Sequence, residues 1–363
     1  AGTPVWEKGA SAIAIDGGLA VGATSRAPLR EALEVRAGEA PALADEAAFR
    51  ATVAKLPDDP LAVAYLAPAR LAPLAQAAAA LMPEQGVGDL PAPQGQIDDL
   101  VAARGDVRGL AIAVRAESGG LRLAAAGDAD EDALAARGLV APDPFAPTIL
   151  GRVPADAAAA AAFADLGPRL EAAIRQLEAA SPQMAGYVDS IEAATGVSLA
   201  DGLVPALSGQ HALVALAGDE PTGALLLTPP NPTAAGQTLG RLRGFVDDAG
   251  LLDGIGDRAA QLDAVQVTRQ EGGPVIAIGN APGLAAQPAA ALAADGAYRA
   301  LVERAGVPDL VTAIAWVDPA ELRAQAARKA AAEGERLPTA LEAVTGLIAW
   351  GEPGGARAFI AIG

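Results

Sequence analysis

The sequence predicts an α+β protein whose largely antiparallel sheets pack against Ala-rich helices. Gly-rich turns separate short alternating or β-branched runs, as in β-hairpins. Helical stretches lie between these hairpins, and several begin at Ser-Pro or Asp-Pro and end at Gly. Hairpins outnumber βαβ units, which favours α+β over a doubly wound fold. Four recurring sequences also indicate an internal duplication whose first copy is N-terminally incomplete.

Turn and capping residues place the elements along the chain. The expected hairpins join 11–15 with 19–23, 108–116 with 121–126, 211–217 with 223–228, 264–269 with 274–278, and 345–350 with 356–362. Single strands are expected at 61–66 and 311–317. Helices are expected at 28–36, 45–56, 68–81, 165–180, 182–195, 233–248, 294–305 and 319–333. Residues 86–96 and 128–147 are expected to be loops.

The recurring sequences define the expected domains. Their matches, in order, are 11–15 with 275–278, 43–51 with 292–300, 57–68 with 308–319, and 107–110 and 118–122 with 344–347 and 353–357. The second copy is preceded by residues that have no counterpart before Ala1, so the chain is expected to open within its first repeat. We therefore predict a partial first repeat at 1–127, a linker at 128–147 and a complete second repeat at 148–363.

Composition excludes several classes of function. The chain has 363 residues, with 26 Lys and Arg against 44 Asp and Glu, and a formal charge of −18. This charge argues against nucleic acid as a partner, because nucleic-acid binding needs a basic face. The absence of Cys excludes a disulfide, a thiolate zinc site and a Cys nucleophile. No apolar run reaches about 18 residues, so no transmembrane segment is expected in this chain.

Three motifs suggest chemistry, but each lacks a part that the chemistry needs. The single histidine, His211, has no Gly-x-Ser-x-Gly sequence to act with, so we interpret it as a strand-edge residue. The acidic run 128–132 lacks the later Gly and Glu of a calcium loop and is expected to be a solvated linker. Gly254-Ile-Gly256 follows carboxylates that would repel a dinucleotide phosphate, so we expect a flexible acidic turn there. We predict no catalytic residue, no metal ligand and no cofactor.

The sparse aromatic residues are more informative, since only 3% of the chain is aromatic. Tyr65 and Trp316 fall at equivalent strand positions of the two copies, and Phe49 and Tyr298 fall at equivalent helix positions. Large side chains of this kind can anchor an Ala-rich core. They can also line an apolar cleft between the two halves. We therefore name these four as candidate ligand-binding residues and keep both interpretations.

Two stretches of sequence carry a family resemblance. One is Leu43-Ala-Asp with Phe49, Leu56-Pro-Asp-Asp and Ala62-Val-Ala-Tyr65; the other runs from Glu192-x₂-Thr195-Gly196 to Leu-Ser-Gly209. The chain resembles a family of actinobacterial envelope proteins, anchored or secreted, that are built on a domain of unknown function. This resemblance implies a duplicated α+β region and an extracytoplasmic location. It supplies no activity and no catalytic residues.

These observations predict a non-enzymatic extracytoplasmic protein that binds a ligand or partner, either an apolar small molecule or an envelope component. A first alternative is a carrier that holds an apolar small molecule or lipid between the two repeats. A second is a hydrolase that depends on carboxylates alone, which would need two carboxylates facing each other in a cleft.

Overall fold

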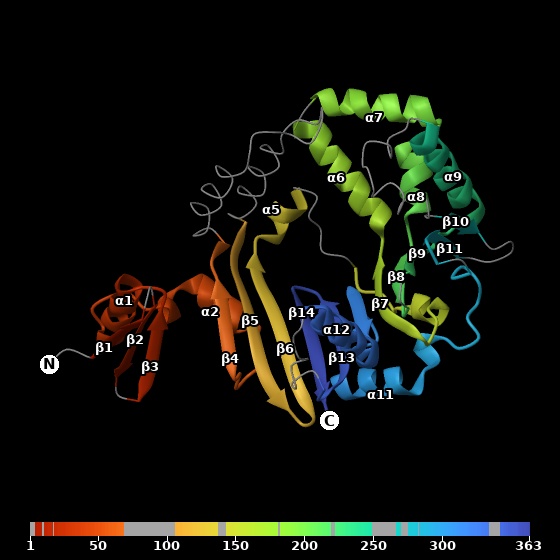
Figure 1. The fold of residues 1–363 in the computed structure, drawn as a ribbon. Coiled ribbons are helices and arrows are strands. Elements are labelled where there is room, and N and C mark those ends of the chain that lie inside the picture. The colour runs from red at the N-terminus through yellow and green to blue at the C-terminus, as the bar shows by residue number, and fades with distance from the viewer. Residues whose placement is uncertain are drawn as a thin grey trace. The chain divides into compact units, whose positions relative to one another are not determined.

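A computed structural model of the chain (Figure 1) describes residues 4–8, 11–16, 18–68, 106–136, 143–180, 182–218, 222–248, 266–269, 275–281, 283–333 and 342–363. The chain forms two compact units, Ala1–Lys55 and Leu56–Gly363, which we call the N-terminal unit and the main unit. Both combine helices with antiparallel strands, so the predicted α+β class is confirmed. The boundary between the units lies inside the range predicted as the first repeat.

The N-terminal unit is a three-stranded antiparallel sheet covered on one face by a helix. Its strands are β1 (Val5–Lys8), β2 (Ser11–Asp16) and β3 (Leu19–Ala23), in that order across the sheet. Helix α1 (Arg26–Ala37) packs Leu29 against Ala12 and Ala14. It ends at Gly38, whose left-handed backbone (φ 78°) suits a residue without a Cβ. A 3-10 turn, η1 (Leu43–Asp45), and helix α2 (Ala47–Val53) follow.

The main unit is built on one sheet of eleven described strands, in the order β10-β11-β9-β8-β7-β12-β13-β14-β6-β5-β4. Their bounds are β4 Ala62–Leu66, β5 Val107–Glu117, β6 Gly120–Ala129, β7 Ala157–Ala164, β8 Gln210–Leu216, β9 Thr222–Thr228, β10 Gln266–Arg269, β11 Ile276–Gly279, β12 Ala313–Val317, β13 Val344–Glu352 and β14 Gly355–Ile362. Alternate residues face opposite sides of the sheet. Leu226 therefore joins the larger core, with Ile348 and Phe359, while Leu227 joins a smaller core on the other face.

Helices of the main unit cover parts of both faces. They are α5 (Glu131–Ala136), α6 (Leu166–Ala180), α7 (Pro182–Thr195), α8 (Val204–Ala206), α9 (Pro232–Asp248), α11 (Gly296–Ala305) and α12 (Pro319–Glu333), with short turns η3 (Thr148–Arg152), η4 (Leu199–Leu203) and η6 (Leu292–Ala294). Helix α9 belongs to the smaller core through Ala235 and Leu239. Helix α11 packs on β13 and β14 and contributes Leu301 to the larger core.

The predicted hairpins and single strands are confirmed, as are the predicted helices that lie within the described residues. The helix predicted at 68–81 from residue 69 onward, the loop at 86–96 and the Gly254 turn lie outside the described residues. The range predicted as a linker, 128–147, includes the end of β6 and helix α5. Asp130 accepts a hydrogen bond from the backbone N–H of Ala133 at the start of that helix.

Strand β7 is the main element that the sequence does not predict. Its residues are Ala except for Phe163, and Ala favours helix while giving no alternation to read. In the structure β7 pairs with β8 on one side and β12 on the other, and Ala160 and Ala162 are buried. Tertiary pairing on both sides therefore overrides the local preference of the sequence.

The recurring sequences fold into matching elements. Turn η1 and helix α2 begin at 43 and 47, and η6 and α11 begin at 292 and 296, so the two turn–helix units have the same internal spacing. Strands β4 and β12, which begin at 62 and 313, follow these units and have the same length. Hairpins β1–β2 and β10–β11 share one register, with Val5 opposite Ala14 and Thr268 opposite Ala277. Strands β7, β8 and β9 lie between β11 and β12 in the sheet.

Candidate functional site

The structure brings two of the four predicted aromatic residues together. Tyr298 on α11 and Trp316 on β12 meet edge to face, with ring centroids 6.2 Å apart and ring planes at 84°. Tyr298 is buried, and burial raises the pKa of its hydroxyl to about 12. The pair belongs with the larger core, since Tyr298 is one of its members and Trp316 packs against it.

The other two predicted aromatic residues belong to different units of the chain. Tyr65 on β4 has Ala111 opposite it, and four strands separate β4 from β12 in the sheet. At about 4.8 Å per strand, β4 and β12 are roughly 24 Å apart across the sheet. Phe49 lies on α2 in the N-terminal unit. Tyr65 and Trp316 are therefore not neighbours in the sheet.

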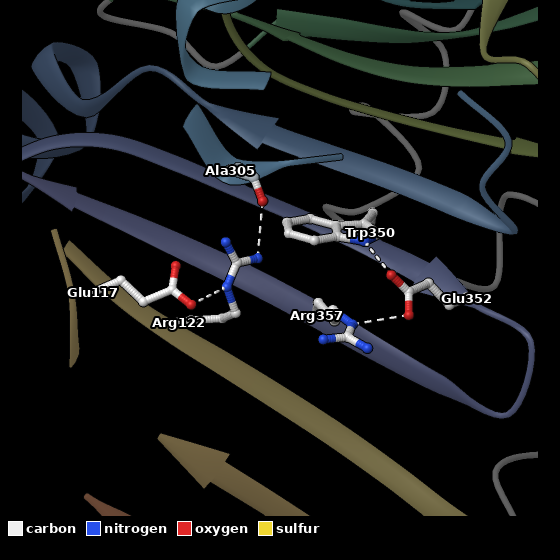
Figure 2. Close-up of polar contacts among 6 residues, drawn as sticks. All are labelled: Glu117, Arg122, Ala305, Trp350, Glu352 and Arg357. Carbon is white, nitrogen blue, oxygen red and sulfur yellow. Dashed lines mark hydrogen bonds and ion pairs between the residues drawn. The ribbon is translucent and has the colours of Figure 1, made fainter. Parts of the chain in front are cut away.

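A cluster of paired charges lies where β5, β6, β13 and β14 run side by side (Figure 2). Arg122 Nε lies 2.7 Å from Glu117 Oε1, and Arg357 Nε lies 2.8 Å from Glu352 Oε2. The indole N–H of Trp350 donates to Glu352 Oε1 at 2.9 Å. We call these five residues the central charge cluster. None of the five belongs to a sequence motif that marks it as functional, although both Arg residues fall within the recurring sequences.

The two ion pairs of the central charge cluster stand at corresponding positions. The separation in sequence between Glu117 and Glu352 equals that between Arg122 and Arg357. In the β6–β14 ladder Arg357 lies opposite Ala124, two residues from Arg122, so both guanidinium groups leave the same face of the sheet. This is the relation that a local two-fold axis between β6 and β14 produces.

Two glycines follow the same two-fold relation. A Cβ added to Gly120 would lie 2.4 Å from the carbonyl oxygen of Ile360, and one added to Gly355 would lie 2.6 Å from that of Ala125. Gly120 and Gly355 have the same separation in sequence as the two ion pairs, and so do Ala125 and Ile360. Both ends of the β6–β14 pairing thus depend on a close backbone approach that only glycine permits.

The electrostatics keep both carboxylates of the cluster ionised. The hydrogen bond from Arg122 lowers the pKa of Glu117 below 4.5 and outweighs the opposing effect of burial. For Glu352 burial raises the pKa most strongly among single causes, but the hydrogen bonds from Trp350 and Arg357 together lower it. A general acid needs the opposite shift, toward neutral pH. These carboxylates are therefore suited to anchoring the two Arg side chains and poorly suited to proton transfer.

Arg122 is the most enclosed charge of the cluster. Its guanidinium carbon lies 5.6 Å from the ring centroids of both Trp350 and Phe359, within the range of cation–π attraction. Its Nη1 donates to the backbone carbonyl of Ala305 at 2.9 Å, at the end of α11 (Figure 2). The side chain is 15% exposed, against 37% for Arg357. Arg122 thus links β6, the β13–β14 hairpin and α11.

His211 lies on β8 between β7 and β9 and is completely buried. Its ring packs 5.5 Å from that of Phe163, and its Nε2 accepts the backbone N–H of Leu166 at 3.4 Å. Burial lowers the pKa of the imidazole, so the ring is neutral at pH 7. The interpretation as a strand-edge residue is confirmed in that His211 lies at the start of β8, and this strand is an interior strand of the sheet, between β7 and β9.

The acidic run predicted as a solvated linker is partly structural. Asp128, at the end of β6, is buried and binds Arg108 through both carboxylate oxygens, at 2.9 and 3.0 Å. Across the described ranges, no three His, Cys, Asp or Glu side chains converge as a metal site would require. Within those same ranges no helix is long and apolar enough to span a membrane.

Two sheets bury their small residues and expose their large ones. In β5, Ala111 and Ala113 are buried, whereas Leu110 and Ile112 are 42% and 50% exposed. Leu66 of β4 lies opposite Leu110, on the same face. We call Leu66, Leu110 and Ile112 the main-unit outer face. Side-chain alternation alone would place the larger residues in the core, so the sequence does not predict this face.

The N-terminal unit repeats this inverted pattern. In β2, Ala12 and Ala14 are buried, whereas Ile13 and Ile15 are 49% and 53% exposed. Trp6 of β1 lies opposite Ile13 and is 55% exposed. We call Trp6, Ile13 and Ile15 the N-terminal outer face.

Fold and site together define an α+β protein with an extended antiparallel sheet, a charge cluster at a local two-fold axis and apolar outer faces. The chain belongs to a protein family described as "Protein of unknown function (DUF3352)", whose family model matches residues 2–280. No curated protein matches the chain, and no solved structure matches it.

Proposed function

We propose that this chain is a non-enzymatic partner-binding protein that engages a protein partner through its apolar outer faces. The observation that carries the proposal is the inverted burial of β2 and β5, in which Ala faces the core and Ile or Leu faces outward. Exposed apolar patches on folded proteins mark interaction sites. Burying an Ile or Leu side chain contributes about 1.5–3 kcal/mol, so a partner that covers these faces gains a substantial driving force.

The chemistry of the titratable groups supports a binding role over catalysis. The ionised carboxylates of the central charge cluster are held by Arg122 and Arg357, and His211 is neutral and shielded from water. Neither arrangement offers a group poised to exchange a proton with a substrate. The cluster instead fixes how the two halves of the sheet pair.

We also propose that the protein is extracytoplasmic and internally duplicated. The resemblance to envelope proteins supports the location. The matched registers of β1–β2 and β10–β11, and the equal sequence spacing of the two ion pairs, support the duplication. The separation of Tyr65 from Trp316 by four strands favours a protein partner over an apolar small molecule held between these two residues.

Site-specific photo-cross-linking in the native cell tests the proposal. A photoreactive residue at position 112 or 15 should capture one discrete protein species, and one at the exposed helix position Arg328 should not. Equal capture at all three positions would contradict partner binding. Turnover of a substrate that is lost in His211→Gln would contradict the non-enzymatic assignment.

A further inference from the structure

The outer face of the N-terminal sheet matches a covered face in the main unit. Hairpins β1–β2 and β10–β11 share their register, with Ile13 and Ile15 corresponding to Ile276 and Ile278. Their inner faces are equivalent in burial, since Ala14 and Ala277 are 0% and 1% exposed. Their outer faces differ, because Ile276 is 0% exposed and Ile13 is 49% exposed. One of two matching surfaces is therefore covered, and the other is open.

Helices cover the outer face of β11. Ile276 and Leu227 pack against Ala235 and Leu239 of α9 and Ala206 of α8, and Ile278 packs at the margin of the same core. Ala235 and Leu239 are four residues apart, so they lie on one side of α9. The surface that matches the N-terminal outer face thus receives a helix with a small residue and a Leu at i and i+4.

The N-terminal outer face has room for such a helix. Strand β3 occupies the place beside β2 that β9 occupies beside β11. It places Gly22 opposite Ile13 and Ala20 opposite Ile15, where β9 places Leu227 opposite Ile276. A Cβ on Gly22 would meet nothing nearer than Ile13 Cγ1 at 3.9 Å. The residues opposite Ile13 and Ile15 are therefore small, and they carry no large side chain that would obstruct a docked helix.

Area and charge indicate one helix of another protein and not a second copy of this chain. Three strands of about five residues present a footprint of roughly 14 by 17 Å, or about 240 Å². A stable dimer buries about 800 Å² per partner, whereas a single helix is about 10 Å wide. Residues 1–55 carry six basic and seven acidic side chains, a net charge of −1, while the whole chain carries −18. A second copy would bring that strong negative charge with it.

We propose that the N-terminal outer face is the docking site for an amphipathic helix of a partner protein, with a small residue and Leu at i and i+4 against Ile13 and Ile15. This inference rests on the proposed partner-binding function and assigns it a site and a kind of partner. Trp6 stands at one side of the site, so its indole is covered when the helix binds.

A peptide of residues 231–248, which copies α9 with its capping Asn231, is the probe. Titrated into the full chain, it should shift the Trp6 emission to the blue and bind saturably, as followed by anisotropy of a peptide label. Ile13→Thr/Ile15→Thr keeps β-branched residues and should weaken binding about tenfold or more, because burial of both Ile side chains is reduced. The peptide with Leu239→Glu should bind at least tenfold more weakly. Circular dichroism should show that both chains stay folded.

A control variant separates this inference from the proposed function. Leu110→Thr/Ile112→Thr changes the main-unit outer face and should leave peptide binding unchanged. If only this control weakens binding, helix docking at the N-terminal outer face is refuted, while partner binding through an outer face stands. No binding of the peptide to the wild-type chain, or equal binding to all variants, also refutes the inference, and cross-linking at position 112 then decides the proposed function independently.

Discussion

At the scale of single residues, burial decides what each titratable group can do. His211 has the one imidazole of the chain, and the fold encloses it between Phe163 and the backbone of Leu166. Glu117 and Glu352 are unlike His211, because each carboxylate is held ionised by a charged hydrogen-bond donor. These three side chains, which are of types that commonly perform acid–base chemistry, are thus engaged in structural contacts.

The buried imidazole makes stability depend on pH. Burial lowers the folded-state pKa of His211 below the ordinary value of 6.5, so below that pH the unfolded chain binds a proton that the folded chain does not. The free energy of unfolding should therefore fall as the pH drops from 7 to 5.5. Urea unfolding at several pH values between 7 and 5.5 measures this change in the free energy of unfolding. His211→Gln should flatten the slope, and an unchanged slope would contradict the assignment.

Arg122 should matter more than Arg357, although the two are matched. Arg122→Met removes an enclosed ion pair, two cation–π contacts and the hydrogen bond to Ala305, and should cost about 2–3 kcal/mol of unfolding free energy. Arg357→Met removes a more exposed pair and should cost about 1 kcal/mol or less. Denaturant unfolding at pH 7 compares them. The difference between the two losses of unfolding free energy should narrow as the pH falls below 4.5 and Glu117 becomes protonated. Equal losses for the two variants at pH 7 would contradict the enclosed role of Arg122.

At the scale of elements, the matching strands provide a direct comparison of covered and open faces. Ile276→Thr leaves a hydroxyl in the core beneath α9 and should cost about 2–3 kcal/mol. Ile13→Thr is the same change at the matching open position and should cost no more than about 0.5 kcal/mol. Thermal and urea unfolding of both variants test this. A large cost at Ile13 would show that its outer face is covered within the isolated chain.

The glycines at the β6–β14 pairing make a second prediction at this scale. Gly120→Ala and Gly355→Ala both force a Cβ into a backbone carbonyl of the neighbouring strand. Since the two contacts correspond by the local two-fold relation, we expect similar losses, of about 2 kcal/mol or more. Gly240→Ala on α9, where a Cβ meets open space, is the control and should be neutral or slightly stabilising. A difference of several kcal/mol between the two strand variants would contradict the two-fold relation.

Sequence patterns predicted helices and strands well where turn and capping residues mark their ends. Gly119 and Gly354 close the two long hairpins with a left-handed backbone, and Gly306 ends α11 in the same way. Patterns failed where Ala dominates, because an Ala run such as β7 carries no periodicity and favours helix by itself. The outer faces were not predicted for a related reason. Which side of β5 faces the core depends on what covers that side, and the larger Leu and Ile residues favoured the side that is in fact exposed.

At the scale of the whole molecule, the sheet order determines which fragments can fold. The predicted linker at 128–147 begins within the last residues of β6 and ends before β7, yet β6 pairs with β14 at the far end of the chain. A division there would separate β6 from β14, and pairing between segments so far apart in the sequence leaves no local signal. The boundary between Lys55 and Leu56 instead leaves the eleven-stranded sheet whole.

Two truncations distinguish these divisions. The fragment 56–363 retains every described strand of the large sheet and should unfold cooperatively with near-native far-UV circular dichroism. The fragment 148–363 loses β4, β5 and β6, which removes Arg122 together with Glu117 and leaves the long edge of β14 unpaired. An unpaired edge of this length recruits other chains, so we expect 148–363 to aggregate or to elute as oligomers in size-exclusion chromatography. A monomeric, cooperatively folded 148–363 would show instead that the range predicted as the second repeat is an independent domain. The sheet would then be stable with β14 as its edge strand, and its pairing with β6 would not be needed for folding.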